Sequence, residues 1–295
     1  MAFQWPPPFD RIPTAQWVDQ PLEALVLNYD TVENHGWYGN LDHTVEQVGE
    51  YARRGDVLVD YSGGTGIFAK RLVDWLGQKP VGSIVDLSPK FLRLSLKKFR
   101  DESRLAFRRI RFLKEERRLE HVDEVLGDTF LERGIDGLVT TNAIHLYFNR
   151  PETVRAWRRV LRHSGRLFIQ SGNIRNPEMP DEKWIIDETV EVIHREAIVI
   201  VKEYYLDILR DEGFEVTSVC RRRIPTRVDE WYEFLSVYHE GVLGWVGGAE
   251  KVTGSAPSEA TVEARLSLMA TAMERTFQGR DECGASCTYV TAEPS

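Results

Sequence analysis

The chain has 295 residues, 42% of them hydrophobic and 28% charged, which is ordinary for a globular protein with a sizeable core. Its net charge of −8 argues against a general nucleic-acid binder, which is normally basic. No apolar run approaches the roughly 20 residues that span a bilayer, and no signal peptide is visible. The 3 cysteines fit neither a disulfide framework nor a zinc knuckle, so we expect a cytoplasmic protein without a metal site.

The N-terminal part of the chain precedes the first predicted strand. Residues 1–22 are rich in proline and tryptophan and indicate an irregular arm, which either wraps the body or closes its aromatic side chains over a site. Residues 23–54 have a helical pattern that is interrupted at residues 35–39, where two glycines flank Trp37 and Tyr38. These two side chains are candidates either for the wall of a ligand site or for packing.

Residues 57–76 predict a strand, a glycine turn and a helix. The apolar run at 57–59 is typical of a strand buried on both faces, and Asp60 ends it. Glycine lets a backbone approach a ligand closely, and a helix start offers unpaired N–H groups and a positive dipole end. The unit therefore predicts a cradle for a nucleotide-like ligand, with Asp60 as an acceptor. The turn consists of Ser62, Gly63, Gly64, Thr65 and Gly66.

Three further segments follow the cradle helix. Residues 81–86 predict a second strand ending in Asp86, twenty positions after Gly66, where a carboxylate can accept hydrogen bonds from ribose hydroxyls. Residues 97–118 are densely basic and predict an amphipathic helix, whose basic face is either simply solvated or a landing site for an acidic substrate or partner. Residues 125–130 predict a third element of the sheet, in which Asp128 could accept from a purine amine and Thr129 could supply a backbone N–H.

The remaining pattern continues the alternation of strands and helices. Residues 134–142 predict a fourth strand ending in Asn142, and a helix follows from 151 to about 163. Further strands are predicted at 166–170, 215–222 and 287–292. This order predicts an α/β fold with a doubly wound, mostly parallel, seven-stranded sheet. Ligands of such sheets bind at the carboxyl ends of the strands, where the sequence places four polar residues: Asp60, Asp86, Asp128 and Asn142.

Several motifs together resemble the ordered motifs of class I S-adenosylmethionine-dependent methyltransferases. They are Asp60-Tyr-Ser-Gly-Gly-Thr-Gly, Asp86-Leu-Ser-Pro, Gly127-Asp128, Asn142-Ala-Ile-His145 and Leu161-Arg-His-Ser-Gly165-Arg-Leu, and the likeness covers roughly residues 29–172 and the last strand. The resemblance implies a Rossmann-like sheet with an antiparallel last strand. It also implies that the glycine turn holds the methionine end of S-adenosyl-L-methionine, that Asp86 binds the ribose and that Asp128 binds the adenine. Ser62 departs from the pattern, because it occupies the first glycine position of the turn.

The cofactor-binding residues that we predict on this basis are Tyr38, Asp60, Ser62, Gly63, Gly64, Gly66, Asp86, Leu87, Asp128, Thr129 and Asn142. The glycine turn alone also fits a dinucleotide-binding fingerprint. Asp60 would repel a pyrophosphate, Gly127-Asp128 suits an adenine pocket, and 56 residues precede the first strand, so the sequence favours the methyl donor. An NAD(P)-dependent oxidoreductase and a non-catalytic cofactor-binding protein remain the alternatives.

The segment after the fourth strand carries the catalytic candidates. His145 lies where substrate and cofactor meet in the resembled family and could accept a proton near neutral pH, or could merely pack. Tyr147 is a second candidate on the same segment, and His239 is a third. Residues 141–144 lack the Asn/Asp-Pro-Pro-aromatic run of enzymes that methylate DNA amino groups. We therefore expect a small-molecule acceptor, and neither a nucleic acid nor a membrane as partner.

The domain organisation follows from these assignments. We predict N-terminal arm and helices at 1–54, a cofactor-binding domain at 55–224 and 286–293, and a helical cap inserted at 225–285. The cap is rich in aromatic residues, which is typical of a lining that encloses a small molecule. Which atom of the acceptor receives the methyl group is not indicated by any motif.

Overall fold

The computed structural model describes residues 33–77, 81–86, 89–113, 115–116, 118–144, 147, 150–172, 205–237, 267, 270–271, 273–275 and 277–295. The chain divides into two compact units. Unit 1 draws on Met1–Gly39, Asn173–Val201 and Arg223–Ser286, and unit 2 on Asn40–Gly172, Lys202–Arg222 and Cys287–Ser295. The predicted arm, His145, His239 and most of the predicted cap lie outside the described residues. The predicted domain boundaries stay a prediction.

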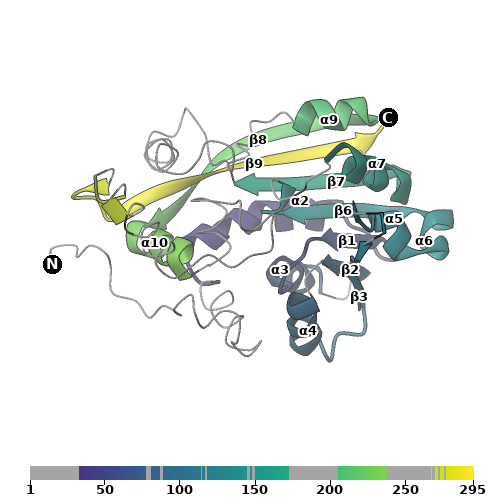
Figure 1. Cartoon of the computed structure of the whole chain (residues 1–295), viewed down its shortest axis with the longest axis horizontal. Coiled ribbons are helices and arrows are strands. Elements are labelled where there is room, and N and C mark those ends of the chain that lie inside the picture. The colour runs from purple at the N-terminus through teal and green to yellow at the C-terminus, as the bar shows by residue number, and fades with distance from the viewer. Residues whose placement is uncertain are drawn as a thin grey trace. The chain divides into compact units, whose positions relative to one another are not determined.

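The central sheet has seven strands in the order β3-β2-β1-β6-β7-β9-β8 (Figure 1). Their bounds are β1 (Val57–Tyr61), β2 (Val81–Asp86), β3 (Leu105–Arg109), β6 (Ile135–Thr141), β7 (Leu161–Gly172), β8 (Phe214–Arg227) and β9 (Glu282–Pro294). Strands β3, β2, β1, β6 and β7 are parallel, and β9 pairs with β7 in the antiparallel direction. The expected α/β fold with a parallel core in a mixed sheet is confirmed.

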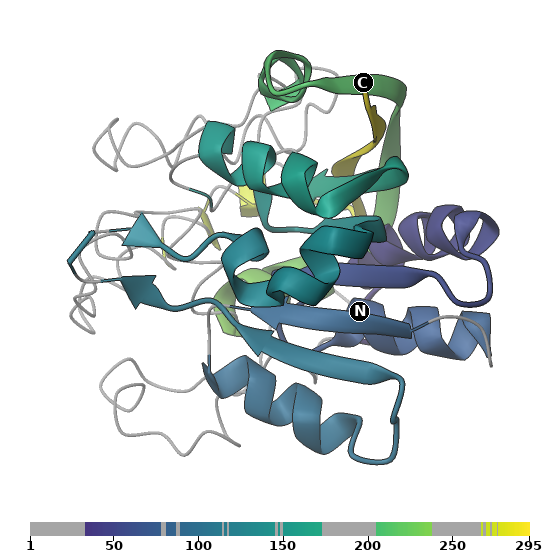
Figure 2. The same ribbon diagram turned by 90° about the vertical axis from the view of Figure 1, so that its right-hand side faces the viewer.

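The helices of unit 2 cover both faces of its parallel strands. Right-handed crossovers place the helices of β1-β2-β3 on one face and the helix between β6 and β7 on the other. Figure 2 shows α2 and α3 together on one side, and α5, α6 and α7 on the other. The bounds are α2 (Asp42–Tyr51), α3 (Ile67–Leu76), α4 (Pro89–Lys98), α5 (Val122–Leu126), α6 (Asp128–Arg133), α7 (Arg150–Val160) and α9 (Tyr205–Asp211).

The core of unit 2 lies where α7 packs on the strands. Trp157 and Val160 of α7 have no exposed surface, and neither have Leu138 of β6 and Leu167 of β7. Each large apolar side chain that is buried in this way stabilises the fold by about 1.5–3 kcal/mol. The apolar runs that predicted these strands are therefore the runs that fill the core.

Among the described residues, no helix is both long enough and apolar enough to cross a bilayer.

The prediction of an amphipathic helix over residues 97–118 is wrong. Helix α4 ends at Lys98, residues 105–109 form β3, and a short hairpin follows from β4 (Phe112–Leu113) and β5 (Arg118–Leu119). Leu105 and Phe107 are two positions apart, as on one face of a strand, and pack against the buried Phe99. The strand ends in two consecutive arginines, Arg108 and Arg109, and lies at an edge of the sheet.

The prediction of a strand at residues 125–130 is also wrong, because residues 125–126 end α5 and residues 128–130 begin α6. The start of α5 has a capping box, in which the Glu124 carboxylate accepts a hydrogen bond of 2.6 Å from the His121 backbone N–H. This cap satisfies the first donor of the helix and so favours a helix over a strand for the short apolar run. The third strand of the parallel sheet is β3.

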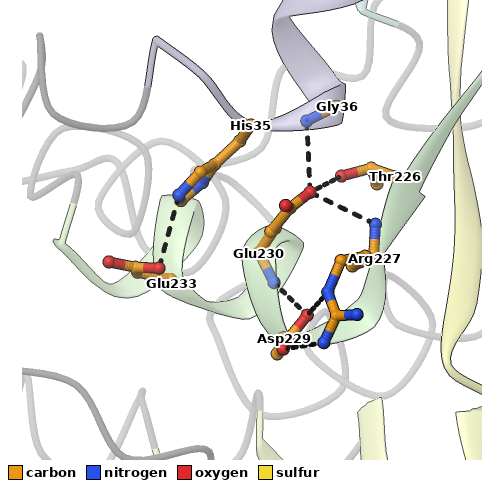
Figure 3. Close-up of polar contacts among 7 residues, drawn as sticks. All are labelled: His35, Gly36, Thr226, Arg227, Asp229, Glu230 and Glu233. Atoms are coloured by element: carbon orange, nitrogen blue, oxygen red, sulfur yellow. Dashed lines mark hydrogen bonds and ion pairs between the residues drawn. The ribbon is translucent and has the colours of Figure 1, made fainter.

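In unit 1, the start of the 3₁₀ helix η2 (Gly36–Leu41) is joined to α10 (Val228–Val237) by polar contacts (Figure 3). The Glu230 carboxylate accepts hydrogen bonds from the Gly36 backbone N–H at 3.1 Å and from the Thr226 hydroxyl at 3.4 Å. His35 Nε2 lies 3.4 Å from the Glu233 carboxylate. Two carboxylates one helical turn apart on α10 thus hold the first residue of η2 and the residue before it.

We predict that Gly36→Ala destabilises the protein by about 1–3 kcal/mol. A Cβ atom at this position would lie 2.8 Å from the Pro225 carbonyl oxygen and 3.2 Å from Thr226 Cα. Both are backbone atoms that cannot turn away. Urea unfolding followed by tryptophan fluorescence measures the change.

Gly49→Ala on α2 is the matched control. The atoms that its Cβ would meet belong to the indole of Trp75, which is 54% exposed and can swing outward. Alanine also favours a helix interior over glycine, so this variant should match the wild type or exceed it in stability. A Gly36→Ala variant as stable as the wild type would contradict the packing described for η2.

Candidate functional site

The turn between β1 and α3 has a backbone that glycine adopts readily and other residues rarely adopt. Ser62, Gly64 and Gly66 have φ angles of 63°, 56° and 82°. A hydrogen bond of 2.9 Å from the Gly66 N–H to the Gly63 carbonyl closes the turn. The left-handed conformation costs roughly 1–2 kcal/mol for a residue with a Cβ, so Ser62 is strained where the glycines are not.

The first turn of α3 begins without a side-chain cap. Its N-cap residue is Gly66, which has no side chain to accept hydrogen bonds from the backbone N–H groups of the helix. Those donors and the positive end of the helix dipole are therefore available to a polar or anionic ligand. This arrangement fits the cofactor end that the sequence analysis assigned to the turn.

Ser95 of α4 supports the glycine turn from the other side. This serine is fully buried, and its hydroxyl donates a hydrogen bond of 3.0 Å to the Gly64 carbonyl oxygen. Ser95 is not among the site residues predicted from the sequence. A signal was present, because Ser95 lies on the same apolar helix face as Leu92 and Phe99, and a buried hydroxyl needs a partner.

The carboxyl ends of β1, β2 and β6 meet at one edge of the sheet. Asp60 is near the end of β1 and 7% exposed, Asp86 is the last residue of β2, and Asn142 directly follows β6. Between β1 and β6 the strand order reverses, which is the place where open α/β sheets bind their ligands. The structure thus places these three residues at the same edge of the sheet, and their roles in ligand binding stay predictions.

Asn142 is held by hydrogen bonds from two directions. Its φ is 52°, and its backbone N–H donates to the Gln170 carbonyl at 2.9 Å and to the Gln170 side-chain oxygen at 3.1 Å. The buried Asn40 donates from Nδ2 to the Asn142 side-chain oxygen at 3.2 Å. The Tyr289 hydroxyl in turn donates to the Asn40 carbonyl at 2.7 Å, and burial raises the pKa of that hydroxyl well above its ordinary range.

Tyr147 contacts the glycine turn directly. Its hydroxyl donates a hydrogen bond of 2.9 Å to Ser62 Oγ and lies 2.7 Å from the hydroxyl oxygen of Thr140 on β6. Its ring makes edge-on contacts with Tyr61 and Trp157 at centroid distances of 5.6 Å and 5.8 Å. Of the two catalytic candidates after β6, the structure describes only this one.

No protein-family model and no curated protein matches the sequence. Solved structures do match. The [4+2]-cyclase SpnF has a TM-score of 0.57 and 18% identity over 96% of this chain and 98% of its own. A candidate sarcosine dimethylglycine methyltransferase from Galdieria sulphuraria has a TM-score of 0.51 and 12% identity over 86% of this chain and 84% of its own. The phosphoethanolamine N-methyltransferase 2 of Haemonchus contortus was solved with S-adenosylhomocysteine. It has a TM-score of 0.51 and 14% identity over 95% of this chain and 59% of its own.

The protein has the fold of class I S-adenosylmethionine-dependent methyltransferases. This confirms the fold that the ordered motifs of the sequence implied, while the implied roles of single residues stay predictions. At these identities the likeness concerns the fold, and SpnF demonstrates that the methyltransferase fold also serves a cyclase.

Two of the predicted cofactor residues were placed at the carboxyl edge of the sheet by the predicted strand at 125–130, which is not a strand in the structure. Asp128 is the exposed first residue of α6 and Thr129 follows it, so their roles in adenine binding stay predictions. Leu87 lies outside the described residues. Tyr38 in unit 1 is 2% exposed, beside Trp37, whose ring packs on Trp231 at a centroid distance of 4.6 Å. Packing therefore accounts for Trp37, and the cofactor role of Tyr38 stays a prediction.

The residues that follow β3 in the methyltransferase fold are tied together by an ion pair. Glu120 accepts a hydrogen bond of 2.8 Å from the Arg111 backbone and one of 2.6 Å from its guanidinium, and its own N–H donates to the Arg111 carbonyl at 2.9 Å. The hydrogen bonds from the guanidinium hold the pKa of the Glu120 carboxyl below its ordinary value. This pair closes the hairpin of β4 and β5.

We predict that Glu120→Gln lowers the melting temperature at pH 7 and that this deficit shrinks in acid. A carboxyl whose pKa is lower in the folded than in the unfolded state stabilises the fold above its unfolded pKa. That stability is lost as the pH falls through the folded pKa. The two melting curves should therefore converge below about pH 4. Glu132→Gln, on an exposed position of α6, controls for the loss of one charge. A deficit that is the same at pH 7 and in acid would argue against the ion pair.

Proposed function

We propose that the protein transfers the methyl group of S-adenosyl-L-methionine to a small-molecule acceptor. The observation that carries this proposal is the β1–α3 turn at the reversal of strand order, with its left-handed backbone and uncapped helix start. Ligands of doubly wound sheets bind at this place. Asp86 and Asn142 add polar groups at the same edge. The fold shared with methyltransferases supports the same ligand.

The protein residues have a limited chemical task in this proposal. When bound, the cofactor supplies an already activated methyl group, so the protein mainly aligns the acceptor and excludes water. The turn at 62–66 holds the methionine end through backbone N–H groups, and Asp86 accepts hydrogen bonds from the ribose hydroxyls. The segment after β6 faces the acceptor, with His145 as the proposed proton acceptor.

A small acceptor is favoured over a macromolecule by three observations. The net charge of −8 does not suit a nucleic acid, and residues 141–144 lack the run typical of DNA amino methylation. The names of two proteins with the same fold refer to small amines, sarcosine dimethylglycine in one case and phosphoethanolamine in the other. These names describe those proteins and support, for this one, the class of acceptor only.

A second function has a specific observation in its favour. SpnF is a [4+2]-cyclase and matches 98% of its own chain to this one, so the fold is compatible with a reaction that is not methyl transfer. A non-catalytic cofactor-binding protein and an NAD(P)-dependent oxidoreductase are the remaining alternatives. Transfer of labelled methyl groups to a pool of small metabolites separates a methyltransferase from a cyclase and from a non-catalytic cofactor-binding protein. A comparison of the cofactors that bind separates it from an NAD(P)-dependent oxidoreductase.

We expect S-adenosylhomocysteine to raise the melting temperature and NAD(P) to leave it unchanged. A ligand that binds only the folded state at 100 times its Kd stabilises that state by about 2.7 kcal/mol. Differential scanning fluorimetry with each ligand measures the shift. Stabilisation by NADH alone would reject the methyl donor.

Asp86→Ala should weaken binding of S-adenosylhomocysteine by about 10- to 100-fold, because a carboxylate makes charge-assisted hydrogen bonds worth about 1.5–3 kcal/mol. Asp74→Ala, which removes an exposed carboxylate of α3, should leave the affinity unchanged. Calorimetric titration of both variants tests whether the end of β2 belongs to the site.

His145→Ala should reduce turnover at least 100-fold while the affinity for S-adenosylhomocysteine stays within about twofold, because a general base contributes roughly 10²–10⁴-fold to rate. His163→Ala on an exposed position of β7 is the control for loss of a histidine. Unchanged turnover in the His145 variant would reject the proposed proton acceptor.

A further inference from the structure

Three hydroxyl groups form a chain at the carboxyl edge of the sheet. Thr140 lies on β6 and is fully buried, Tyr147 follows β6, and Ser62 belongs to the turn after β1. The oxygen of Tyr147 is 2.7 Å from that of Thr140 and 2.9 Å from that of Ser62. The chain therefore connects the glycine turn to the segment that follows the neighbouring strand.

The hydrogen bonds between these three hydroxyl groups run in one direction. A tyrosine hydroxyl has one hydrogen, and that of Tyr147 is donated to Ser62 Oγ. The contact between Thr140 and Tyr147 then requires Thr140 as the donor. Ser62 accepts at its oxygen, so its own hydrogen is left for another acceptor. Within the described part of the chain, the Ser62 side chain has no further hydrogen bond, and the residue is partly exposed.

The ring of Tyr147 is fixed in place by packing. Tyr61 and Trp157 are buried, and each meets the ring of Tyr147 edge-on. They also meet each other, at a centroid distance of 5.5 Å. Because one ring comes from β1 and the other from α7, the phenol is held between two rigid elements. Its hydroxyl can therefore serve as a fixed point for Ser62.

Ser62 is a costly choice for its position. Its φ of 63° is left-handed, and glycine would adopt that conformation without strain. Residues held in such conformations cluster at ligand-binding sites, where surrounding contacts keep them in place. The hydrogen bond from Tyr147 is such a contact. The hydroxyl of Ser62 provides a hydrogen-bond donor at this position, which a glycine side chain would lack.

We propose that Tyr147 is a positioning residue, which aims the Ser62 hydroxyl as a hydrogen-bond donor at the carboxylate of the methionine end of the cofactor. This inference rests on the proposed function. Cofactor affinity then depends on the segment after β6, the same segment that carries the acceptor candidates. Tyr147 donates to one lone pair of Ser62 Oγ, and the hydrogen of Ser62 can turn toward an anionic ligand.

Calorimetric titration with two ligands tests this role. Tyr147→Phe removes the donor to Ser62 and should lower the affinity for S-adenosylhomocysteine by about five- to tenfold, which corresponds to the loss of one net hydrogen bond. 5′-Methylthioadenosine lacks the amino-acid end, so its affinity should stay within about twofold of the wild type. Ser62→Gly should weaken S-adenosylhomocysteine at least as much. The double variant should bind as weakly as Ser62→Gly alone, because both substitutions remove one and the same donor.

The control for losing a tyrosine hydroxyl is Tyr51→Phe. The Tyr51 hydroxyl shares its one hydrogen between the carbonyl oxygens of Asp136 at 2.9 Å and Ser164 at 3.0 Å, near the amino end of β6. Removal of this hydroxyl should lower the melting temperature and leave the affinity for S-adenosylhomocysteine unchanged. Thr140→Val removes the first donor and keeps Tyr147, and should weaken S-adenosylhomocysteine by about two- to threefold. That variant keeps the test intact if Tyr147→Phe does not fold.

Distinct results would overturn distinct statements. A wild type that binds S-adenosylhomocysteine and a Tyr147→Phe variant that binds it equally well would reject the positioning role alone. Reduced turnover of that variant with unchanged affinity would make Tyr147 a catalytic residue instead. Equal weakening of both ligands would also reject the proposal, because the effect would not concern the carboxylate. A wild type that binds neither ligand would reject the proposed function itself.

Discussion

The left-handed backbone between β1 and α3 is the constraint on which the site depends. Five residues must reverse the chain from a buried strand into a helix that is buried on one face, and three of them take φ angles between 56° and 82°. Two of these are glycines, which adopt the conformation freely. The consequence is a turn without bulky side chains next to helix N–H groups that no side chain caps. Such a turn receives a ligand through its backbone.

Strain at this edge is matched by local support. Ser62 and Asn142 are the non-glycine residues with positive φ in the described part of the chain, and each follows one of the two central strands. Tyr147 donates to Ser62, while Gln170 and Asn40 hold Asn142. Ser95 fixes the carbonyl of Gly64. Two neighbouring strand ends are thus kept in unfavourable conformations by partly buried hydrogen bonds, which is the arrangement expected of a preorganised site.

The sequence predicted the parts of the fold whose pattern is local. The apolar run of β1, the glycines after it and the helical spacing of α3 lie within twenty residues and needed no partner to be recognised. The same holds for Asp86 at the end of β2 and for α7. Ser95 was missed, although its place on an apolar helix face was a visible signal.

Two segments were misassigned for a physical reason. Strand β3 lies at the edge of the sheet, where none of its residues is fully buried, and its sequence Leu-Ala-Phe-Arg-Arg does not show the alternation that distinguishes a strand from a helix. The short apolar run at 125–126 was equally ambiguous, and the capping box at His121 decides it in favour of α5. The contact of Tyr147 with Ser62 spans 85 positions of sequence, and no local pattern indicates it.

The central claim is that the edge formed by β1, β2 and β6 binds the methyl donor. A crystal structure with S-adenosylhomocysteine tests it most directly. We expect the amino-acid end against residues 62–66, the ribose at Asp86, and the sulfur facing the segment that begins at Asn142. The space beside the sulfur would then define the size and polarity of the acceptor. Density for the ligand at another part of the molecule, or with its adenosine at the glycine turn, would contradict the account.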